Sequence, residues 1–253
     1  MSIHSSSHVI SRRDYDAVIF DLDGVITQTA TLHKAAWKTL FDDFLERHAA
    51  RLGGAHRAFD ADSDYRLYID GKARYEGVAS FLASRGIALP YGDPGDGPDE
   101  ETVCGLGNKK NAIYRELLEK NGVEVYPSTI DLIHKLRSKK FATAVVSASR
   151  NCAEVLEAAH LSDLFDTRVD GIDLERMHLP GKPAPDSFLE AARRIGVEPT
   201  RAVVVEDAIA GVEAGRNGGF GCVIGVDRTG HADALKTAGA NIVVADLAEL
   251  DAG

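Results

Sequence analysis

Two aspartates that lie two positions apart are the first candidates for catalytic residues. Asp21 and Asp23 follow the apolar run Ala17–Phe20 and precede Gly24. In an extended segment, side chains two residues apart point to the same side, and a glycine permits a sharp turn after them. One carboxylate could attack phosphorus while the other carries a proton, and both could bind a hard cation. A capped surface loop could carry the same acid pair.

A second acid pair, Glu206–Asp207, directly follows the apolar run Ala202–Val205. Buried carboxylates are costly unless they are paired or bound to a metal. Together with Asp21 and Asp23, this pair would place four carboxylates around one site, which predicts Mg²⁺. The alternative is a pair of acids stabilised by the dipole of a helix N-terminus.

Two further segments follow the same pattern of an apolar run and then polar residues. Ser147–Asn151 (SASRN) comes after Phe141–Val146, and its hydroxyls with helix N-terminal amides could bind an anion. The segment Gly181–Asp186 (GKPAPD) presents Lys182 between rigid prolines, where it could neutralise charge on a transferring phosphoryl group. An ordinary serine cap and a solvated surface lysine are the alternatives.

Outside residues 31–123, short apolar runs alternate with helical stretches along the chain. The expected strands are Asp16–Asp21, Phe141–Val146, Ala202–Val205, Phe220–Val226 and Ile242–Ala245. The expected helices are Pro127–Ser138, Asn151–His160, Pro185–Ile195 and Ile209–Asn217. This alternation predicts an α/β fold with a doubly wound parallel sheet, in which ligands lie beyond the carboxyl ends of the strands. All four polar clusters would therefore meet at one edge.

One long segment has no strand pattern. Leu32–Leu45, Tyr75–Ser84 and Lys109–Asn121 have helical character, and the polar Gly/Pro segment Tyr91–Glu100 is expected to be a mobile loop. We therefore expect a helical cap domain at 31–123, inserted into a core domain formed by 1–30 and 124–253.

The N-terminal segment, residues 1–13, is rich in Ser and His and lacks the apolar centre of a secretory signal. It is expected to be a disordered leader of the core domain.

Composition excludes some classes of partner. The net charge is −10 and there is no dense basic run, which argues against nucleic-acid binding. No apolar stretch reaches the roughly 18–20 residues of a membrane-spanning helix. Three widely spaced cysteines, Cys104, Cys152 and Cys222, are typical of a reduced, cytoplasmic protein. The oligomeric state is not determined by these features, and a monomer is compatible with them.

The order of the clusters makes the chain recognisable. DLDGV at Asp21–Val25, Ser147, Lys182 in GKPAPD and the pair Glu206–Asp207 together resemble the motifs of the haloacid dehalogenase (HAD) superfamily, which has a Rossmann-like core. Dehalogenases of that superfamily lack the second aspartate, so the resemblance favours phosphoryl transfer. The stretch Asp21–Trp37 (DLDGVITQTATLHKAAW) is similar to the β-phosphoglucomutase subgroup.

The resemblance implies roles for residues near the phosphoryl group. Asp21 would become phosphorylated and Asp23 would move the proton, with Thr29 and His33 supporting Asp23. Lys182 would complete the site. Mg²⁺ would be held by the four carboxylates, those of Asp21, Asp23, Glu206 and Asp207.

It also implies residues that bind the substrate, a small sugar phosphate. Ser147 and Ala148 would hold the transferring phosphate. Ser149 and Asn151 would hold the distant one. In the cap, the sugar-phosphate clamp would be formed by Arg74, Lys110 and Asn111.

Three functions are compatible with these expectations. The first is a mutase that converts β-glucose 1-phosphate to glucose 6-phosphate through the 1,6-bisphosphate. The second is a sugar-phosphate phosphatase, in which water accepts the phosphoryl group. The third is a non-catalytic phosphosugar-binding module, against which the intact pair Asp21 and Asp23 argues.

Overall fold

The chain divides into two compact units in the computed structural model, which describes residues 8–52 and 57–253. Unit 1 comprises Met1–Gln28 and Val123–Gly253, and unit 2 comprises Thr29–Gly122. The sequence placed the two boundaries after residues 30 and 123, and the structure places them after Gln28 and Gly122.

Unit 1 is built on a six-stranded sheet in the order β4-β3-β2-β5-β6-β7, and every neighbouring pair is parallel. In chain order the strands are β2 (Ala17–Asp21), β3 (Ala142–Val146), β4 (Thr167–Val169), β5 (Ala202–Glu206), β6 (Cys222–Val226) and β7 (Ile242–Val244). The fully buried strand β2 is central, and Phe20 lies between Val145 of β3 and Val205 of β5. The residues that follow these three strands must therefore meet at the same edge.

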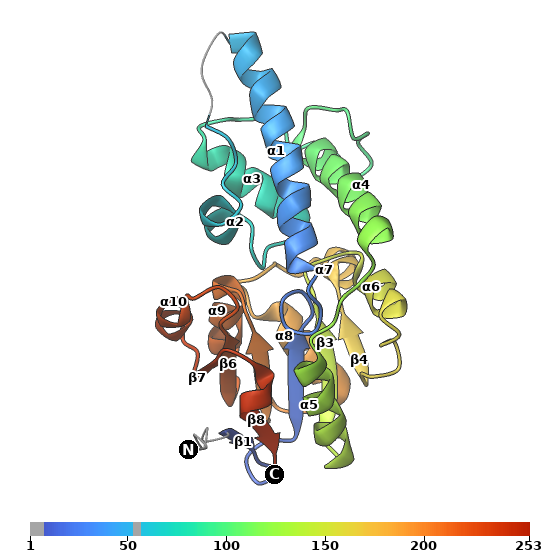
Figure 1. The fold of residues 1–253 in the computed structure, drawn as a ribbon, viewed down its shortest axis with the longest axis vertical. Helices are drawn as coiled ribbons and strands as arrows, with labels where there is room; N and C mark the ends of the chain where they lie inside the picture. Colours follow the sequence, from blue (N-terminus) through green and yellow to red (C-terminus); the bar gives the residue numbers. More distant parts are fainter. Residues whose placement is uncertain (1–7, 53–56) are drawn as a thin grey trace. The chain divides into compact units, whose positions relative to one another are not determined.

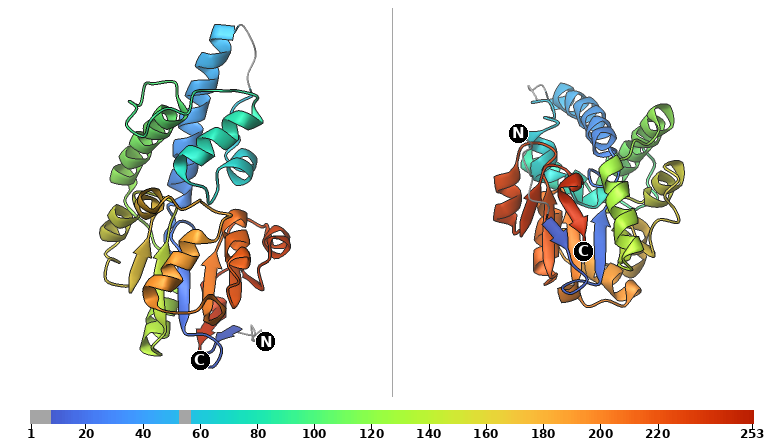
Figure 2. Two further views of the ribbon diagram at one scale, coloured as in Figure 1. Left: turned by 180° about the vertical axis from the view of Figure 1, so that it is seen from behind. Right: turned by 60° about the horizontal axis from the view of Figure 1, so that its bottom comes forward.

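Helices cover both faces of this sheet. They are α5 (Pro127–Ser138), α6 (Cys152–Ala158), α7 (Gly171–Met177), α8 (Asp186–Ile195), α9 (Ile209–Asn217) and α10 (Ala232–Ala238), with 3₁₀ turns η1 (Pro199–Arg201) and η2 (Leu247–Glu249). Figure 1 views the sheet from the side of α5, and the left view of Figure 2 shows it from the side of α8. The predicted doubly wound parallel α/β fold is confirmed.

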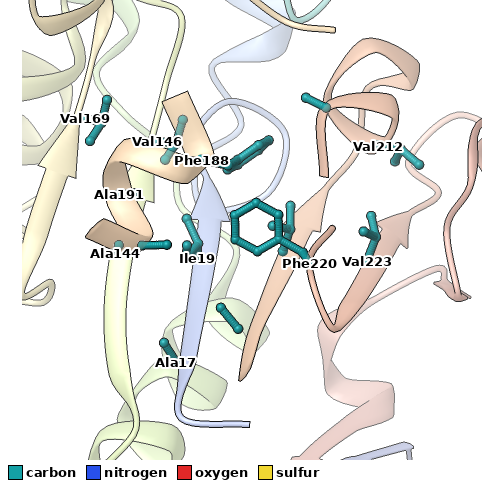
Figure 3. Packing of buried hydrophobic residues seen from close by; sticks show 14 of the residues in the cluster. Ala17, Ile19, Ala144, Val146, Val169, Phe188, Ala191, Val212, Phe220 and Val223 are labelled. Carbon is teal, nitrogen blue, oxygen red and sulfur yellow. The ribbon is translucent and has the colours of Figure 1, made fainter. Parts of the chain in front are cut away.

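Alternate residues of the strands form the core beneath α8, α9 and α10 (Figure 3). Ile19 of β2 belongs to it, together with Phe188 of α8 and Phe220, whose rings meet edge to face at 6.1 Å. Such packing positions α8 rigidly, and the loop before α8 carries Lys182. The core therefore holds the loop at the sheet edge.

The N-terminal expectation was wrong in part. His8–Ile10 form strand β1, which pairs in parallel with β8 (Leu250–Ala252) in a separate two-stranded sheet, and Ile10 is buried. Residues 1–7 of the predicted leader lie outside the described residues. A three-residue strand at each end of the chain has too little periodic pattern to be recognised, because its pairing partner lies more than 200 residues away.

Within the described residues of unit 2, the regular elements are all helices joined by loops. Its helices are α1 (Ala30–Leu52), α2 (Ser63–Tyr68), α3 (Arg74–Ser84) and α4 (Val103–Asn121). Their apolar faces share an aromatic core around Phe41, whose ring centroid lies 4.0 Å from that of Phe81. Helix α4 begins at Val103, before the predicted start at Lys109, because Thr102 caps it by accepting a hydrogen bond from Gly105 N. The glycines in this first turn weaken the helical pattern.

The Gly/Pro segment Tyr91–Glu100, expected to be mobile, is tied to unit 2 by hydrogen bonds. The Asp96 Oδ2 atom accepts from Asp93 N and from Thr102 Oγ1, and Asn108 Nδ2 donates to the carbonyl oxygens of Pro94 and Asp96. These contacts oppose the expected mobility.

Within the described ranges, no helix combines the length and apolarity that crossing a bilayer requires.

Candidate active site

A buried lysine links two carboxylates at the carboxyl edge of the sheet. Asp21 is the last residue of β2 and is 6% exposed. Lys182 Nζ donates to Asp21 Oδ1 at 2.5 Å and also to Glu206 Oε1. The lysine is 3% exposed, and its ammonium lies 4.9 Å from the centre of the Phe188 ring. It is therefore not a solvated surface lysine.

Burial and charge shift the pKa values of this pair. Burial raises the pKa of the Asp21 carboxyl group well above its ordinary value, although the Lys182 ammonium lowers it. The carboxylates of Glu206 and Asp23 raise it further. Burial favours the neutral amine of Lys182, but Asp21 and Glu206 outweigh this effect and raise the pKa of the ammonium. A second cation here would further favour the ionised, nucleophilic form of Asp21.

Three carboxylates converge closely enough to hold a metal ion. Asp21, Glu206 and Asp207 each offer one oxygen, and these atoms lie within 4.8 Å of one another. Hard oxygen donors at this spacing suit a divalent cation such as Mg²⁺. Glu206 also accepts a hydrogen bond from Ala208 N at 2.7 Å through Oε2, so its orientation is fixed from both sides. Asp23, the fourth predicted ligand, is not part of this group.

Two glycines leave room for the acidic side chains. Gly24 has φ +90°, and a Cβ at this position would lie 1.9 Å from Asp207 Oδ2. A Cβ on Gly211, in the first turns of α9, would lie 1.8 Å from Glu206 Oε1. Both glycines lie against carboxylates of the same three-residue group. We call Gly24 and Gly211 the glycine cradle, because a side chain at either position would displace one of these acids.

Gly24→Ala is expected to weaken metal binding and to destabilise unit 1. The positive φ costs about 1–3 kcal/mol for a residue with a side chain, and the methyl group must also displace Asp207. Isothermal titration with Mg²⁺ and urea unfolding measure the two effects. Gly196→Ala is the matched control, because Gly196 has φ +68° and open space around its missing Cβ. Equal metal affinity in the two variants would contradict the glycine cradle.

Ser147 connects the phosphate-loop candidate to Asp23. Its Oγ donates to Asp23 Oδ2 at 3.2 Å and accepts from Ser149 N at 3.0 Å. Ser149 Oγ in turn accepts from Asn151 N at 3.1 Å, immediately before α6. Ala148 lies between the two serines, half-buried in the same loop. The loop is thus pre-shaped by its own hydroxyls, and two of its amides already have partners.

The predicted cap residues form two groups in unit 2. Arg74, the first residue of α3, donates from Nη2 to Asn111 Oδ1 at 2.8 Å. His33 Nδ1 lies 2.6 Å from Lys110 Nζ. Thr29 is buried directly before α1. The structure therefore pairs Arg74 with Asn111 and His33 with Lys110.

Two aromatic residues that were not predicted as site residues surround Lys110. This residue is only 4% exposed, and its ammonium lies 4.7 Å from the centre of the Tyr114 ring and 5.1 Å from that of Trp37. Tyr114 also stacks on the His33 ring at 4.1 Å. A helical i,i+4 step joins His33 to Trp37 and Lys110 to Tyr114, and this spacing could have indicated the cage.

Comparison with known proteins identifies the family. A family model described as haloacid dehalogenase-like hydrolase matches residues 15–219. A β-phosphoglucomutase of Mycobacterium tuberculosis is 47% identical over 237 residues, 92% of this chain and 90% of that protein. A validoxylamine A 7'-phosphate phosphatase of Streptomyces hygroscopicus is 30% identical, over 93% and 96%.

A solved structure agrees with these similarities. The β-phosphoglucomutase of Clostridium difficile superimposes with a TM-score of 0.72 at 28% identity, over 93% of this chain and 92% of that one. The family model covers most of the chain, including Asp21, Lys182 and the pair Glu206–Asp207. The chain therefore belongs to the haloacid dehalogenase-like hydrolase family.

Proposed function

We propose that the protein is a magnesium-dependent phosphotransferase that interconverts β-glucose 1-phosphate and glucose 6-phosphate through the 1,6-bisphosphate. The observation that carries the proposal is the buried Asp21 carboxylate, held by Lys182 beside Glu206 and Asp207. The choice of reaction rests on the 47% identity to the M. tuberculosis β-phosphoglucomutase.

In the proposed reaction an oxygen of Asp21 attacks phosphorus, and the bond from phosphorus to the sugar oxygen breaks. Asp23 gives its proton to that leaving oxygen and later takes a proton from the acceptor hydroxyl. The hydrogen bond from Ser147 Oγ restrains Asp23, while Lys182 restrains the nucleophile. Most of the rate in such transfers comes from positioning and electrostatics, which this rigid arrangement supplies.

The metal ion would be held by Asp21, Glu206 and Asp207. Mg²⁺ at this position would neutralise charge on the phosphoryl oxygens. Asp23 was predicted as a fourth ligand, but its carboxylate lies outside the three-residue group and accepts from Ser147. We therefore assign Asp23 to proton transfer.

We further propose that unit 2 is a cap that binds the substrate. Arg74 and Asn111 would bind the phosphate remote from Asp21, and Lys110 the sugar. Thr29 and His33 would support Asp23. In unit 1, Ser147 and Ala148 would hold the transferring phosphate, and Ser149 and Asn151 the remote one.

A sugar-phosphate phosphatase is the second candidate. It is favoured by the validoxylamine A 7'-phosphate phosphatase, which is similar over 93% of this chain. The two activities share Asp21 and Asp23 and differ in the acceptor, a sugar hydroxyl or water. A non-catalytic binding module is disfavoured, because simple binding does not require a buried carboxylate held by a lysine beside two further carboxylates that could hold a metal ion.

The decisive experiment uses pure protein, Mg²⁺ and β-glucose 1-phosphate, with and without a trace of glucose 1,6-bisphosphate. Glucose 6-phosphate that depends on the bisphosphate supports the mutase. Inorganic phosphate released at a comparable rate supports the phosphatase. A parallel sample with EDTA tests the metal requirement, and undiminished turnover there would contradict the metal site.

Arg74→Ala is expected to reduce kcat/KM for the mutase reaction by about 10- to 100-fold, the range for losing charged hydrogen bonds to a phosphate. Enzyme phosphorylation by acetyl phosphate, which has no second phosphate, should be spared. Arg74→Lys should recover part of the loss, because an ammonium retains the charge but lacks the planar pair of donors. Coupled glucose 6-phosphate assays measure both variants.

Arg47→Ala is the control for Arg74→Ala. Arg47 is an exposed arginine of α1 in the same unit and pairs with Asp43 at 3.1 Å. It should retain full activity. An Arg74→Ala enzyme with unchanged kcat/KM would show that the clamp is formed by other residues.

We also propose a cytoplasmic location, which rests on Cys104, Cys152 and Cys222, three buried free thiols.

A further inference from the structure

Asp23 lies in a closed turn that follows β2. In this Asp23 turn, Leu22–Thr27, Gly24 N donates to Thr27 O at 2.8 Å. The amides of Ile26 and Thr27 both donate to Leu22 O, at 2.9 and 3.0 Å, and Thr27 Oγ1 donates to the same oxygen at 3.2 Å. The turn is therefore closed at its base, where it leaves the strand.

Residues at the start of α5 donate hydrogen bonds to the second half of the Asp23 turn. Thr129 Oγ1 donates to Val25 O at 2.8 Å, and Tyr126 N donates to Ile26 O at 2.9 Å. Thr129 is fully buried. These contacts restrain the carbonyl groups of Val25 and Ile26 but not that of Gly24.

Arg228 restrains the Gly24 carbonyl group, which belongs to the peptide between Gly24 and Val25. Its Nε donates to Gly24 O at 3.0 Å from the loop after β6, and its guanidinium lies 3.6 Å from the centre of the Tyr126 ring. Nη1 donates to Ala245 O and to Asp246 Oδ2, both at 3.3 Å. The side chain of Arg228 is 14% exposed. These contacts, on three sides of the guanidinium group, fix its orientation.

The geometry of Gly24 explains why this contact matters. Gly24 has φ +90° and no side chain, so its own packing cannot restrain the tip of the turn. A rotation of the peptide between Gly24 and Val25 would change the backbone angles of Gly24 and so shift Asp23, to which Gly24 is directly bonded. Within the described residues, the Nη2 atom of Arg228 is buried without a hydrogen-bond partner. Such an atom is costly, which argues that the arginine is not selected for stability alone.

We propose that Arg228, stacked on Tyr126, is a positioning residue for proton transfer: it fixes the Gly24 peptide and so aims the Asp23 carboxyl group at the leaving oxygen. The inference rests on the proposed function, in which Asp23 is the general acid. Arg228 acts through Asp23 and does not itself donate the proton.

The proposal predicts a dependence on the leaving group. When Asp21 attacks a sugar phosphate, the bond from Asp21 to phosphorus forms, the sugar oxygen leaves, and the proton of Asp23 moves to that oxygen. A sugar alkoxide is a poor leaving group and needs the proton, whereas the acetate released from acetyl phosphate leaves without it. Misaiming Asp23 should therefore slow the first transfer and spare the second.

The test measures single-turnover phosphorylation of the Mg²⁺-loaded enzyme by rapid quench and intact-mass detection. The donors are glucose 1,6-bisphosphate and acetyl phosphate. Arg228→Met should slow phosphorylation by the bisphosphate about 10- to 100-fold, part of the range for general acid catalysis, and change the acetyl phosphate rate by less than about 3-fold. Arg228→Lys should recover part of the loss, because it keeps a donor for Gly24 O.

Two further variants distinguish a loss of Asp23 positioning from a general loss of folding. Tyr126→Leu removes the ring beneath the guanidinium but keeps the backbone donor to Ile26, and it should show a smaller loss with the same selectivity. Arg201→Met is the matched control, because Arg201 also bonds a backbone oxygen, Arg13 O, but lies at the opposite end of β2. It should leave both rates unchanged.

The outcomes separate this inference from the function on which it rests. Asp23→Asn should show the same selective loss in a stronger form. If it does, but Arg228→Met slows both donors equally or neither, the positioning role is overturned. If Asp23→Asn itself slows both donors equally or neither, the acid role of Asp23 fails, and the inference falls with it.

Discussion

Asp21→Asn is expected to lower kcat by about 10⁴-fold or more, because no amide can replace a carboxylate as the covalent acceptor of a phosphoryl group. The substitution keeps an oxygen for the Lys182 ammonium and changes the volume little. Burial, and to a lesser extent repulsion from Glu206 and Asp23, raises the pKa of Asp21, so the ionised carboxylate is disfavoured in the folded protein and a neutral amide removes that penalty. The melting temperature should therefore stay equal or rise while the activity disappears.

The measurement pairs glucose 6-phosphate formation with thermal unfolding and with intact-mass detection of the phosphorylated enzyme. Asp16→Asn is the control, since Asp16 lies just before the opposite end of β2 and pairs with Arg201 at 2.6 Å. It should remain active and become phosphorylated. If the Asp21→Asn enzyme still gains one phosphate on exposure to the bisphosphate, the nucleophile is a different residue.

Lys182→Met is expected to have the second largest effect, because it damages folding and catalysis together. The methionine leaves Asp21 and Glu206 buried without the cation between them. Breaking a buried ion pair in this way costs about 3–5 kcal/mol. Activity should be lost as well, since the nucleophile loses the charge that orients it and favours its ionised form.

The stability of the Lys182→Met variant should depend on pH in a defined direction. Burial already raises the pKa of Asp21 in the folded protein, and removal of Lys182, which opposes this shift, should raise it further. A carboxyl group with a raised folded-state pKa imposes no penalty when it is protonated in both states. The penalty grows as the pH rises from the unfolded value of about 4 towards the folded value.

Urea unfolding in EDTA at several pH values between about 4 and 8 tests this prediction. The free energy of unfolding of Lys182→Met should fall with increasing pH more steeply than that of the wild-type protein. Lys135→Met is the control, because Lys135 forms an exposed ion pair with Asp251 that solvent screens, so its loss should change stability little. Parallel pH curves for the two variants would contradict the bridging role of Lys182.

The sequence by itself determined the fold class and the neighbourhood of the site. Short apolar runs alternating with helices specify a parallel sheet, because each run is buried on both faces and each crossover needs a helix. Once the sheet is parallel, Asp21, Ser147 and Glu206 must share an edge, since each lies at the carboxyl end of a strand. That inference needs only local pattern and the direction of the chain.

Only the tertiary structure decided what each side chain touches. Lys182 could have been solvated, but packing of α8 on the sheet buries its ammonium between Asp21 and Glu206. Asp23 shares its motif with Asp21, yet the turn at Gly24 directs its carboxylate to Ser147, outside the three-carboxylate group. Spacing along a chain brings two residues near each other but does not set the rotation of the peptide between them.

The least predictable features join segments that are far apart in the sequence. Arg228 reaches Gly24 from the loop after β6, across 204 positions. Strand β1 pairs with β8 at the other end of the chain. Neither contact leaves a periodic or local signal, because a hydrogen bond to a backbone oxygen requires no particular residue at the accepting position. Strand order and helix packing bring these segments together, and both are properties of the folded chain alone.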